Sequence, residues 1–448
     1  MSDLLLRNCR YVTRLGIDEG SILVDNGRIE AIRRSERFTA DRVVDCKNML
    51  VMPGAIDAHV HIYSPGWQEE NFDTGTRAAA AGGVTTVLDM PSQPPHPTND
   101  VQAFVKKRRA GERAANVNFC LYGGEVQTTD DVAQIKPLVA AGAVGFKFIT
   151  GGAGFIKDDT VLYTGFEEIK KANSIAALHA ENDPLVELFR SRFKPSRHDA
   201  EAFLDARPGV VEEEALRKSI LFARTTGCRL HVAHLPSKRG AEIIAEGKHD
   251  GLLLTAETCP HYLMLSRKDY KKYRHLMIVT PPIRDSSDQN ALWVGLKRDV
   301  IDVISTDHCA YSRRAKDAGK TSAWKTPPGM PGLETLLPLM LTQVNKGRLT
   351  VRNLVRLIAE TPARIFGLPR KGRLSVGADA DIVVVDPKRA YRFSVDAMES
   401  VGGFSPFDGW TMTGKPVMTI VNGRMVMEDG EVIERKQGRF VRPLHRTE

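Results

Sequence analysis

Apolar and polar residues alternate differently in the middle of the chain and at its two ends. Between residues 53 and 373, apolar runs of strand length recur with helical segments between them. This pattern predicts buried parallel strands at 55–60, 84–90, 116–122, 144–149, 175–179, 229–234, 252–257 and 301–307. Eight strands, each followed by a helix, predict an α/β fold of the (β/α)8 TIM barrel type. We expect one helix at 72–81 to stop at Gly82, and another to begin after Ser237 and close at Gly247.

The ends of the chain have a short-strand pattern that the middle lacks. Strands are expected at 4–9, 21–24, 28–32, 42–46, 380–386 and 417–427. The pairs Asn26-Gly27 and Asn422-Gly423 supply the positive φ that tight hairpins need. We therefore predict a composite β-sandwich domain formed by both termini, residues 1–52 and 374–448, around a barrel of residues 53–373.

Composition narrows the class of protein. A chain of 448 residues with 42% hydrophobic and 26% charged residues has the composition of a globular protein, which excludes a disordered one. The net charge of +8 raises nucleic acids and anionic membranes as partners. The basic stretches at 106–109, 268–274 and 435–446 are short and contain no interleaved stacking aromatics, so we expect no nucleic-acid partner.

The cysteines and the apolar segments indicate the cellular compartment of the protein. The six cysteines are dispersed and form no CxxC pair, which argues against a disulfide framework and favours the reducing cytoplasm. No apolar stretch has the length of a signal core or a membrane span, so no membrane partner is expected.

Metal-binding residue types stand at the ends of several expected strands. Asp57, His59 and His61 are two residues apart, so a β-strand points all three to one face, and two imidazoles on one face can bind a divalent metal. In the sixth strand, an odd separation puts His231 and His234 on opposite faces. We select His234 for the site because catalytic groups gather at the C-terminal ends of barrel strands.

Three further groups extend this pattern. Lys147 interrupts an apolar strand, His179 closes the fifth strand and Asp307 ends the eighth. Each alone has an ordinary explanation, as a lysine that reaches the rim, a hydrogen-bonded core histidine or a helix-capping aspartate. Together with the other histidines they favour one shared metal site, because unrelated structural roles would scatter such residues.

The sequence resembles the amidohydrolase superfamily, and within it the cyclic amidohydrolases: allantoinase, dihydropyrimidinase (hydantoinase) and dihydroorotase. The resemblance extends over about residues 1–440. It rests on PGAIDAHVH at 53–61, GTRAAAAGGVTT at 75–86, GFK at 145–147, HAEN at 179–182, HVAH at 231–234, ETCPHY at 257–262, PPIRD at 281–285 and STDH at 305–308.

The resemblance implies two divalent metal ions, usually Zn²⁺, and a small cyclic amide as substrate. It assigns the first metal to His59, His61 and Asp307, the second to His179 and His234, and the bridge between them to Lys147 carboxylated by CO2. A carbamate is an anion with two oxygens, so it can hold two cations where a neutral lysine cannot. The implied reaction is attack of a metal-bridging hydroxide on the ring carbonyl, with Asp307 passing the proton to the leaving nitrogen.

Two positions argue against dihydroorotase, which stays an alternative. Dihydroorotases carry an arginine two residues after the second histidine of His-x-His and an asparagine after Met-Pro, where this chain has Tyr63 and Ser92. Hydantoinases place a tyrosine about five residues after the bridging lysine, where this chain has Gly151-Gly152-Ala153-Gly154. The sequence segments at 143–147, 226–234 and 281–285 resemble those of allantoinase. The segments at 158–159 and 179–182 resemble those of hydantoinase. We expect a five- or six-membered cyclic ureide or imide, allantoin-like or hydantoin-like.

The resemblance suggests further features of the site and the assembly. Candidate substrate-binding residues are Tyr63, Ser92, Thr280 and Tyr311, and loop 151–156 is either a lid or a plain connection. Relatives are commonly homo-oligomers, and we expect a tetramer or dimer. A non-catalytic scaffold is the rival class, because some vertebrate relatives of dihydropyrimidinase have lost metal ligands. All six ligand positions are present in this chain, which favours an enzyme.

Overall fold

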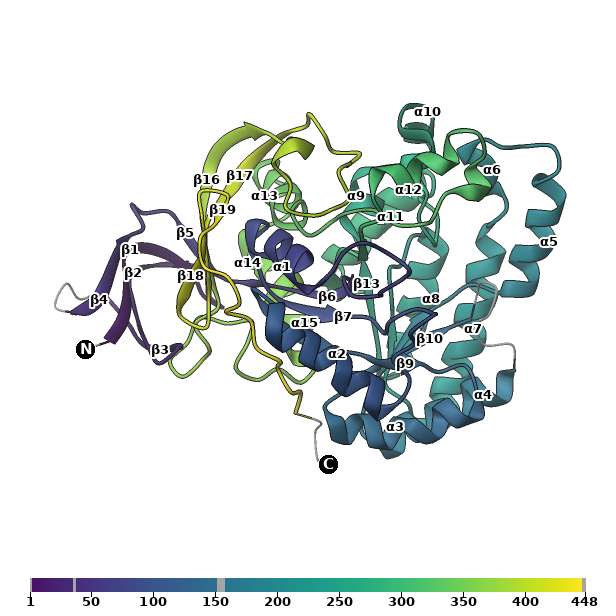
Figure 1. Ribbon diagram of the computed structural model, residues 1–448, viewed down its shortest axis with the longest axis horizontal. Helices are drawn as coiled ribbons and strands as arrows, with labels where there is room; N and C mark the ends of the chain where they lie inside the picture. Colours follow the sequence, from purple (N-terminus) through teal and green to yellow (C-terminus); the bar gives the residue numbers. More distant parts are fainter. Residues whose placement is uncertain (1, 35–37, 151–157, 445–448) are drawn as a thin grey trace.

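A barrel and a β domain lie side by side in the computed structural model (Figure 1). The structure describes residues 2–34, 38–150 and 158–444. The chain crosses from the β domain into the barrel at residues 53–55. It has returned to the β domain by residues 377–380, whose backbone groups bond to Gly27 and Ile29.

Eight strand positions form the barrel in the described part of the chain. They are β6 (Ala55–His61), β7 (Val84–Asp89), β8 (Asn118–Leu121) with β9 (Gly123–Glu125), β10 (Phe146–Ile149), β11 (Ala176–His179), β12 (Leu230–Val232), β13 (Leu254–Thr258), and β14 (Val303–Ile304) with β15 (His308–Cys309). They pair in the orders β15-β6-β7-β8 and β14-β13-β12-β11-β10-β9, and the pairs with a recorded register are parallel. The predicted strands and the predicted TIM barrel are confirmed.

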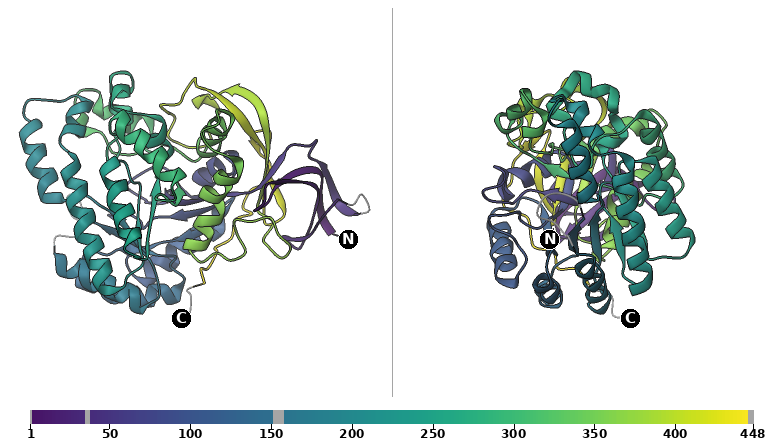
Figure 2. Two further views of the ribbon diagram at one scale, coloured as in Figure 1. Left: turned by 180° about the vertical axis from the view of Figure 1, so that it is seen from behind. Right: turned by 90° about the vertical axis from the view of Figure 1, so that its right-hand side faces the viewer.

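Helices surround these strands (Figure 2). They are α1 (Phe72–Ala81), α2 (Val101–Ala114), α3 (Thr129–Ala141), α4 (Asp159–Lys171), α5 (Asp183–Phe193), α6 (Ala200–Asp205), α7 (Gly209–Thr226), α8 (Lys238–His249), α9 (Pro260–Met264), α10 (Tyr270–Tyr273), α11 (Ser286–Lys297), α12 (Arg313–Asp317), α13 (Leu336–Asn345), α14 (Val351–Val355) and α15 (Thr361–Ile365). None of the helices in the described ranges is long and apolar enough to cross a membrane.

The two helix ends predicted from capping residues have different outcomes. Helix α1 stops before Gly82, as expected, and α8 starts after Ser237, whose side chain accepts a hydrogen bond from the Gly240 amide. The predicted stop of α8 at Gly247 is wrong, since the helix continues to His249. A Cβ at Gly247 would lie 2.8 Å from the Leu254 side chain, so this glycine serves close packing on β13 instead.

The β domain is assembled from both ends of the chain. Its strands are β1 (Ser2–Val12), β2 (Ile17–Asp25), β3 (Arg28–Arg33), β4 (Ala40–Asp45), β5 (Leu50–Pro53), β16 (Ile382–Arg392), β17 (Thr411–Val421), β18 (Arg424–Glu428) and β19 (Glu431–Val432). Antiparallel pairing of β5 with β16 joins the two ends in one sheet, and side chains such as Leu6, Ile22, Val384 and Ile420 share a buried core. The β-sandwich domain is thus confirmed, while its division from the barrel at 52/53 and 373/374 stays a prediction.

Both predicted hairpins form. Asn26 joins β2 to β3 with φ 50°, and Asn422 joins β17 to β18 with φ 51°. The second hairpin also binds the barrel, because the Asn422 amide donates to Asp381 at 2.8 Å and Asn118 of β8 donates to the same carboxylate at 3.0 Å. Lys371 completes this buried junction with its Nζ 2.5 Å from Asp381. The two parts of the molecule are therefore tied by charged and polar contacts near the start of β16.

A second buried ion pair supports the strand ends. Lys107 of α2 lies with its Nζ 2.8 Å from Asp89 at the end of β7, and both side chains are almost fully buried. Asp89 also accepts the Ile62 amide at 2.9 Å, which holds the segment just after His61.

We expect Lys107→Met to lower the free energy of unfolding by about 3–5 kcal/mol, because it leaves the Asp89 carboxylate buried without its cation. Urea denaturation would measure the change. Lys106→Met is the control, since Lys106 is exposed on the same helix turn. Equal stability of the two variants would contradict a structural role for the pair.

Candidate metal centre

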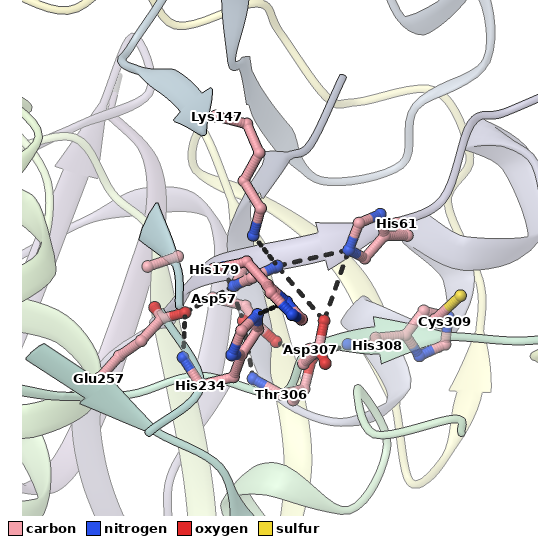
Figure 3. Close-up of polar contacts among 12 residues, drawn as sticks. Asp57, His61, Lys147, His179, His234, Glu257, Thr306, Asp307, His308 and Cys309 are labelled. Atoms are coloured by element: carbon pink, nitrogen blue, oxygen red, sulfur yellow. Dashed lines mark hydrogen bonds and ion pairs between the residues drawn. The ribbon is translucent and has the colours of Figure 1, made fainter. Parts of the chain in front are cut away.

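The predicted metal ligands converge at the C-terminal ends of the barrel strands (Figure 3). His59 and His61 leave β6 with their Nε2 atoms 3.3 Å apart. Asp307, between β14 and β15, places Oδ1 3.3 Å from His59 Nε2 and 3.4 Å from His61 Nε2. These three ligand atoms form one cluster that could hold a metal ion.

The other three predicted ligands lie next to this cluster. His179 at the end of β11 has its Nδ1 3.1 Å from Nε2 of His234, which follows β12. The Nζ of Lys147 on β10 is 3.4 Å from His59 Nε2, and the rings of His59 and His234 have centroids 5.1 Å apart. Two groups of ligand atoms therefore stand side by side, with the lysine reaching into them.

The charges and lone pairs in the cluster suit divalent cations. Burial, with the Lys147 cation, lowers the pKa of His59 to about 4, and burial holds the pKa of His234 well below its usual value. Burial opposes ionisation of Asp307, but His59 and His61 lower its pKa to about 2. Neutral imidazole nitrogens and an ionised carboxylate meet at van der Waals distance, an arrangement that a cation stabilises, and imidazole and carboxylate together suit zinc and similar metals.

The backbone is in the left-handed region at two of these residues. His234 has φ 37° and Asp307 has φ 51°. Non-glycine residues avoid this region, and where a structure imposes it the position is often functional. His234 lies two residues beyond the end of β12, so its direction is set by this turn and not by strand alternation.

The profile of the Amidohydrolase family matches residues 50–426. The chain belongs to the amidohydrolase family. Its fold superposes on the solved structure of L-hydantoinase (dihydropyrimidinase) from Arthrobacter aurescens with a TM-score of 0.95 and 35% identity, covering 99% of this chain and 100% of that one.

Relatives with two other activities align over nearly all of this amidohydrolase. A dihydroorotase from Methanothermobacter thermautotrophicus is 36% identical, over 99% of this chain and 98% of its own. An allantoinase from Rubrobacter xylanophilus is 34% identical, over 98% of each chain. The resemblance read from the motifs is thereby confirmed at the level of the family.

Buried carboxylates orient the predicted metal ligands of the amidohydrolase. Glu257 at the end of β13 lies between two imidazoles, with Oε1 2.6 Å from His59 Nδ1 and Oε2 3.2 Å from His231 Nε2. Burial opposes its ionisation, but these two histidines hold the pKa of Glu257 well below the usual range. The ionised carboxylate thus accepts a hydrogen bond from the Nδ1–H of His59, which leaves the Nε2 lone pair directed at Asp307 and His61.

Two further buried carboxylates fix other parts of the cluster. Asp57 accepts hydrogen bonds from the Thr306 amide at 3.0 Å and the Thr306 hydroxyl at 2.6 Å, which ties β6 to the turn before Asp307. Glu181 lies 2.9 Å from His179 Nε2 and 2.5 Å from Arg207. The sequence motifs contain Glu257 and Glu181, but only their positions near the C-terminal ends of strands could have signalled a role.

We expect Glu257→Gln to weaken zinc binding by about 10–100-fold, because the amide cannot serve as the anionic acceptor that fixes the His59 tautomer. Competition with a chromophoric chelator would measure the affinity. Glu246→Gln on α8 is the control, since that side chain is exposed and far from any ligand. An unchanged affinity in Glu257→Gln would show that His59 needs no such partner.

A cavity of about 240 Å³ opens over the ligands. Of the predicted substrate-binding residues, Thr280 lines it. The Tyr63 ring stacks on Phe72, with centroids 5.1 Å apart, and Ser92 donates to the Tyr63 carbonyl at 2.9 Å. Tyr311 packs against Trp67 with ring centroids 5.3 Å apart. Substrate contact by these four residues stays a prediction, and the candidate lid at 151–156 lies outside the described residues.

The cavity also contains side chains that the sequence analysis did not single out. They include Trp67, Gln93, Glu181, Arg207 and Cys309. Trp67 and Gln93 come from the segments after β6 and β7, and Arg207 from the connection between α6 and α7. Such connections carry the specificity of TIM barrels, but their residues have no periodic pattern that would mark them in advance.

Proposed function

We propose that this amidohydrolase hydrolyses the C–N amide bond of a five- or six-membered cyclic ureide or imide, allantoin-like or hydantoin-like. The observation that carries the proposal is a cavity of a size suited to a small ring, lined by three histidines, Lys147 and Asp307, with the buried His59 in contact with them. Similarity to a hydantoinase and an allantoinase over almost the whole chain supports it.

We assign one divalent metal to His59, His61 and Asp307, and a second to His179 and His234, with Lys147 as the bridge. Burial lowers the pKa of Lys147, which favours the neutral amine. That amine can form a C–N bond with CO2 and lose a proton to give the carbamate. Divalent cations bound there would polarise the ring carbonyl and acidify water at neutral pH.

Asp307 is proposed to transfer the proton. Its carboxylate is ionised at neutral pH because its pKa is about 2. In this role Oδ2 or Oδ1 accepts the proton of the attacking water and returns it to the ring nitrogen as the C–N bond breaks. The products are the ring-opened acid and its free ureido or amide nitrogen, and Asp307 ends the cycle as a carboxylate.

A dihydroorotase activity is the second candidate, because the cavity contains an arginine after all. Arg207 lines the cavity. It is far in the sequence from Tyr63, the position at which dihydroorotases carry their arginine. A guanidinium there could bind a substrate carboxylate with the nitrogens that Glu181 does not engage. The similarity to a dihydroorotase over 99% of the chain supports this alternative.

A turnover screen on metal-reconstituted enzyme would test these proposals. Allantoin, hydantoin, dihydrouracil, dihydroorotate and cyclic imides are the substrates, and we expect ring opening of a neutral ureide or imide that is lost with a chelator and restored by metal with bicarbonate. Preference for dihydroorotate, with a selective loss in Arg207→Gln, would establish the second candidate. Metal-loaded enzyme that opens none of these rings would contradict both.

Zinc as the metal, a tetrameric or dimeric assembly and a cytoplasmic location stay predictions. Metal analysis of the purified protein and its mass in solution are the corresponding measurements.

A further inference from the structure

A second and larger cavity lies at the other end of the barrel. It has a volume of about 640 Å³ and is formed by the turn between β1 and β2, by α14 and α15, by the connection at 367–373 and by Leu444 near the C-terminus. Arg364, Gly367 and Leu444 also line a small hollow with Val144, Ile175 and Arg229, residues that stand just before β10, β11 and β12. The cavity is therefore at the N-terminal face of the barrel, opposite the metal centre.

The lining of this cavity is strongly basic. Its charged residues are Arg14, Arg352, Arg356, Arg364, Lys371, Arg373 and, as the one acid, Glu360. Part of this charge is neutralised, since Arg352 pairs with Glu360 at 2.6 Å, Arg356 with Asp299 at 2.7 Å and Lys371 with Asp379 and Asp381 at 3.0 and 2.5 Å.

Three cations of the cavity have no carboxylate partner among the described residues. No ion pair or side-chain hydrogen bond involves the guanidinium of Arg14 or Arg364 in that part of the chain. Arg373 bonds only neutral groups, the Ser375 hydroxyl at 3.0 Å and the Pro369 carbonyl. In addition, Nη1 of Arg352 is buried without a hydrogen-bond partner. Arg14, Arg364 and Arg373 are exposed to solvent, so the cost of a buried N–H without an acceptor applies to Arg352 alone.

Two glycines in the wall of this cavity allow neighbouring backbone segments to approach each other closely. Gly367 and Gly372 have φ 67° and 73°, and a Cβ would lie 2.4 Å from the Leu444 carbonyl oxygen or 2.3 Å from that of Ala359. Between α14 and α15 the helix contains a π-helical turn at Arg356–Glu360, a feature that often accompanies binding sites. The Arg352 Nε donates to the Arg14 carbonyl at 3.3 Å, so the barrel and the β domain both contribute to one shaped surface.

We propose that this cavity binds a compact polyanion with at least two phosphate groups, such as a nucleoside di- or triphosphate. Arginine guanidinium groups match phosphate oxygens in bidentate geometry, and three uncompensated positive charges correspond to the charge of such a group. The volume lies within the range of small-molecule sites. A ligand here would bridge the barrel and the β domain and stand apart from the reacting ring.

Isothermal titration of the metal-loaded, full-length protein with inorganic pyrophosphate tests the proposal, with inorganic phosphate as the weaker probe. We expect one pyrophosphate per chain, bound at least tenfold more tightly than phosphate and more weakly as salt rises. Arg364→Glu should weaken pyrophosphate binding at least tenfold. Arg109→Glu, which makes the same charge change at an exposed position on α2 outside the cavity, should leave it unchanged.

The thermal midpoint and the hydrolytic activity of Arg364→Glu show whether a loss of pyrophosphate binding is local to the cavity. Arg364→Glu should keep the thermal midpoint and the hydrolytic activity of the unmodified enzyme, which shows that the fold and the metal centre are intact. Pyrophosphate that binds both variants equally, for example by contact with the active-site metals, would overturn the proposal, as would absence of binding. A change of solution mass in Arg364→Glu without any pyrophosphate binding would likewise overturn it and assign the basic cavity to contact between copies of the chain.

Discussion

Lys147→Ala is expected to lower kcat/KM for the cyclic substrate by about 10³-fold or more, equivalent to about 4 kcal/mol of transition-state stabilisation. Lys147 is 2% exposed, and its Nζ lies 3.4 Å from His59 Nε2. Its loss removes the anion that we propose to hold the two cations together. Steady-state kinetics with metal analysis of the same sample would measure the effect.

Short carboxylates should partly restore the activity of Lys147→Ala, because acetate or propionate can occupy the space of the missing carbamate and bring back two oxygens. Lys171→Ala is the control, since Lys171 is exposed on α4 and forms only a surface pair with Glu168. Rescue of the Lys147 variant alone would support the bridge. Unchanged turnover in Lys147→Ala would show that the bridge is assigned to the wrong residue.

Asp307→Asn is expected to lower kcat by about 10³–10⁴-fold while the protein keeps most of its metal. The amide retains an oxygen near His59 and His61, but it cannot take a proton from water at neutral pH. The unmodified carboxylate can, because its pKa of about 2 leaves it ionised. Rate measurements at saturating substrate, with metal content determined in parallel, would separate proton transfer from metal binding.

Asp250→Asn provides the matched control for this substitution. Asp250 follows α8 on the surface, where it pairs with Arg224, so its neutralisation should leave kcat unchanged. If Asp307→Asn lost its metal along with its activity, Asp307 would be a ligand whose role in proton transfer is not needed to explain the loss. Full activity in Asp307→Asn would contradict both roles.

Local sequence pattern determined the barrel, the composite β domain and the six candidate ligands of this protein. Strand alternation sends His59 and His61 to one face, and strand ends meet at one rim of a parallel barrel, so the residues at those ends must be neighbours. The hairpins at Asn26 and Asn422 followed from the positive φ that two-residue turns require.

Only the tertiary structure decided which groups complete the site. The pairing of Glu257 with His59 joins residues 198 positions apart, and no local pattern specifies such a contact. Arg207 enters the cavity from an irregular connection. His234 was selected for its place at a strand end, but its direction is set by a left-handed turn beyond the strand and not by strand alternation. The basic cavity also depends on the tertiary structure, because Arg14 joins the arginines at residues 352–373 only when the β domain packs on the barrel.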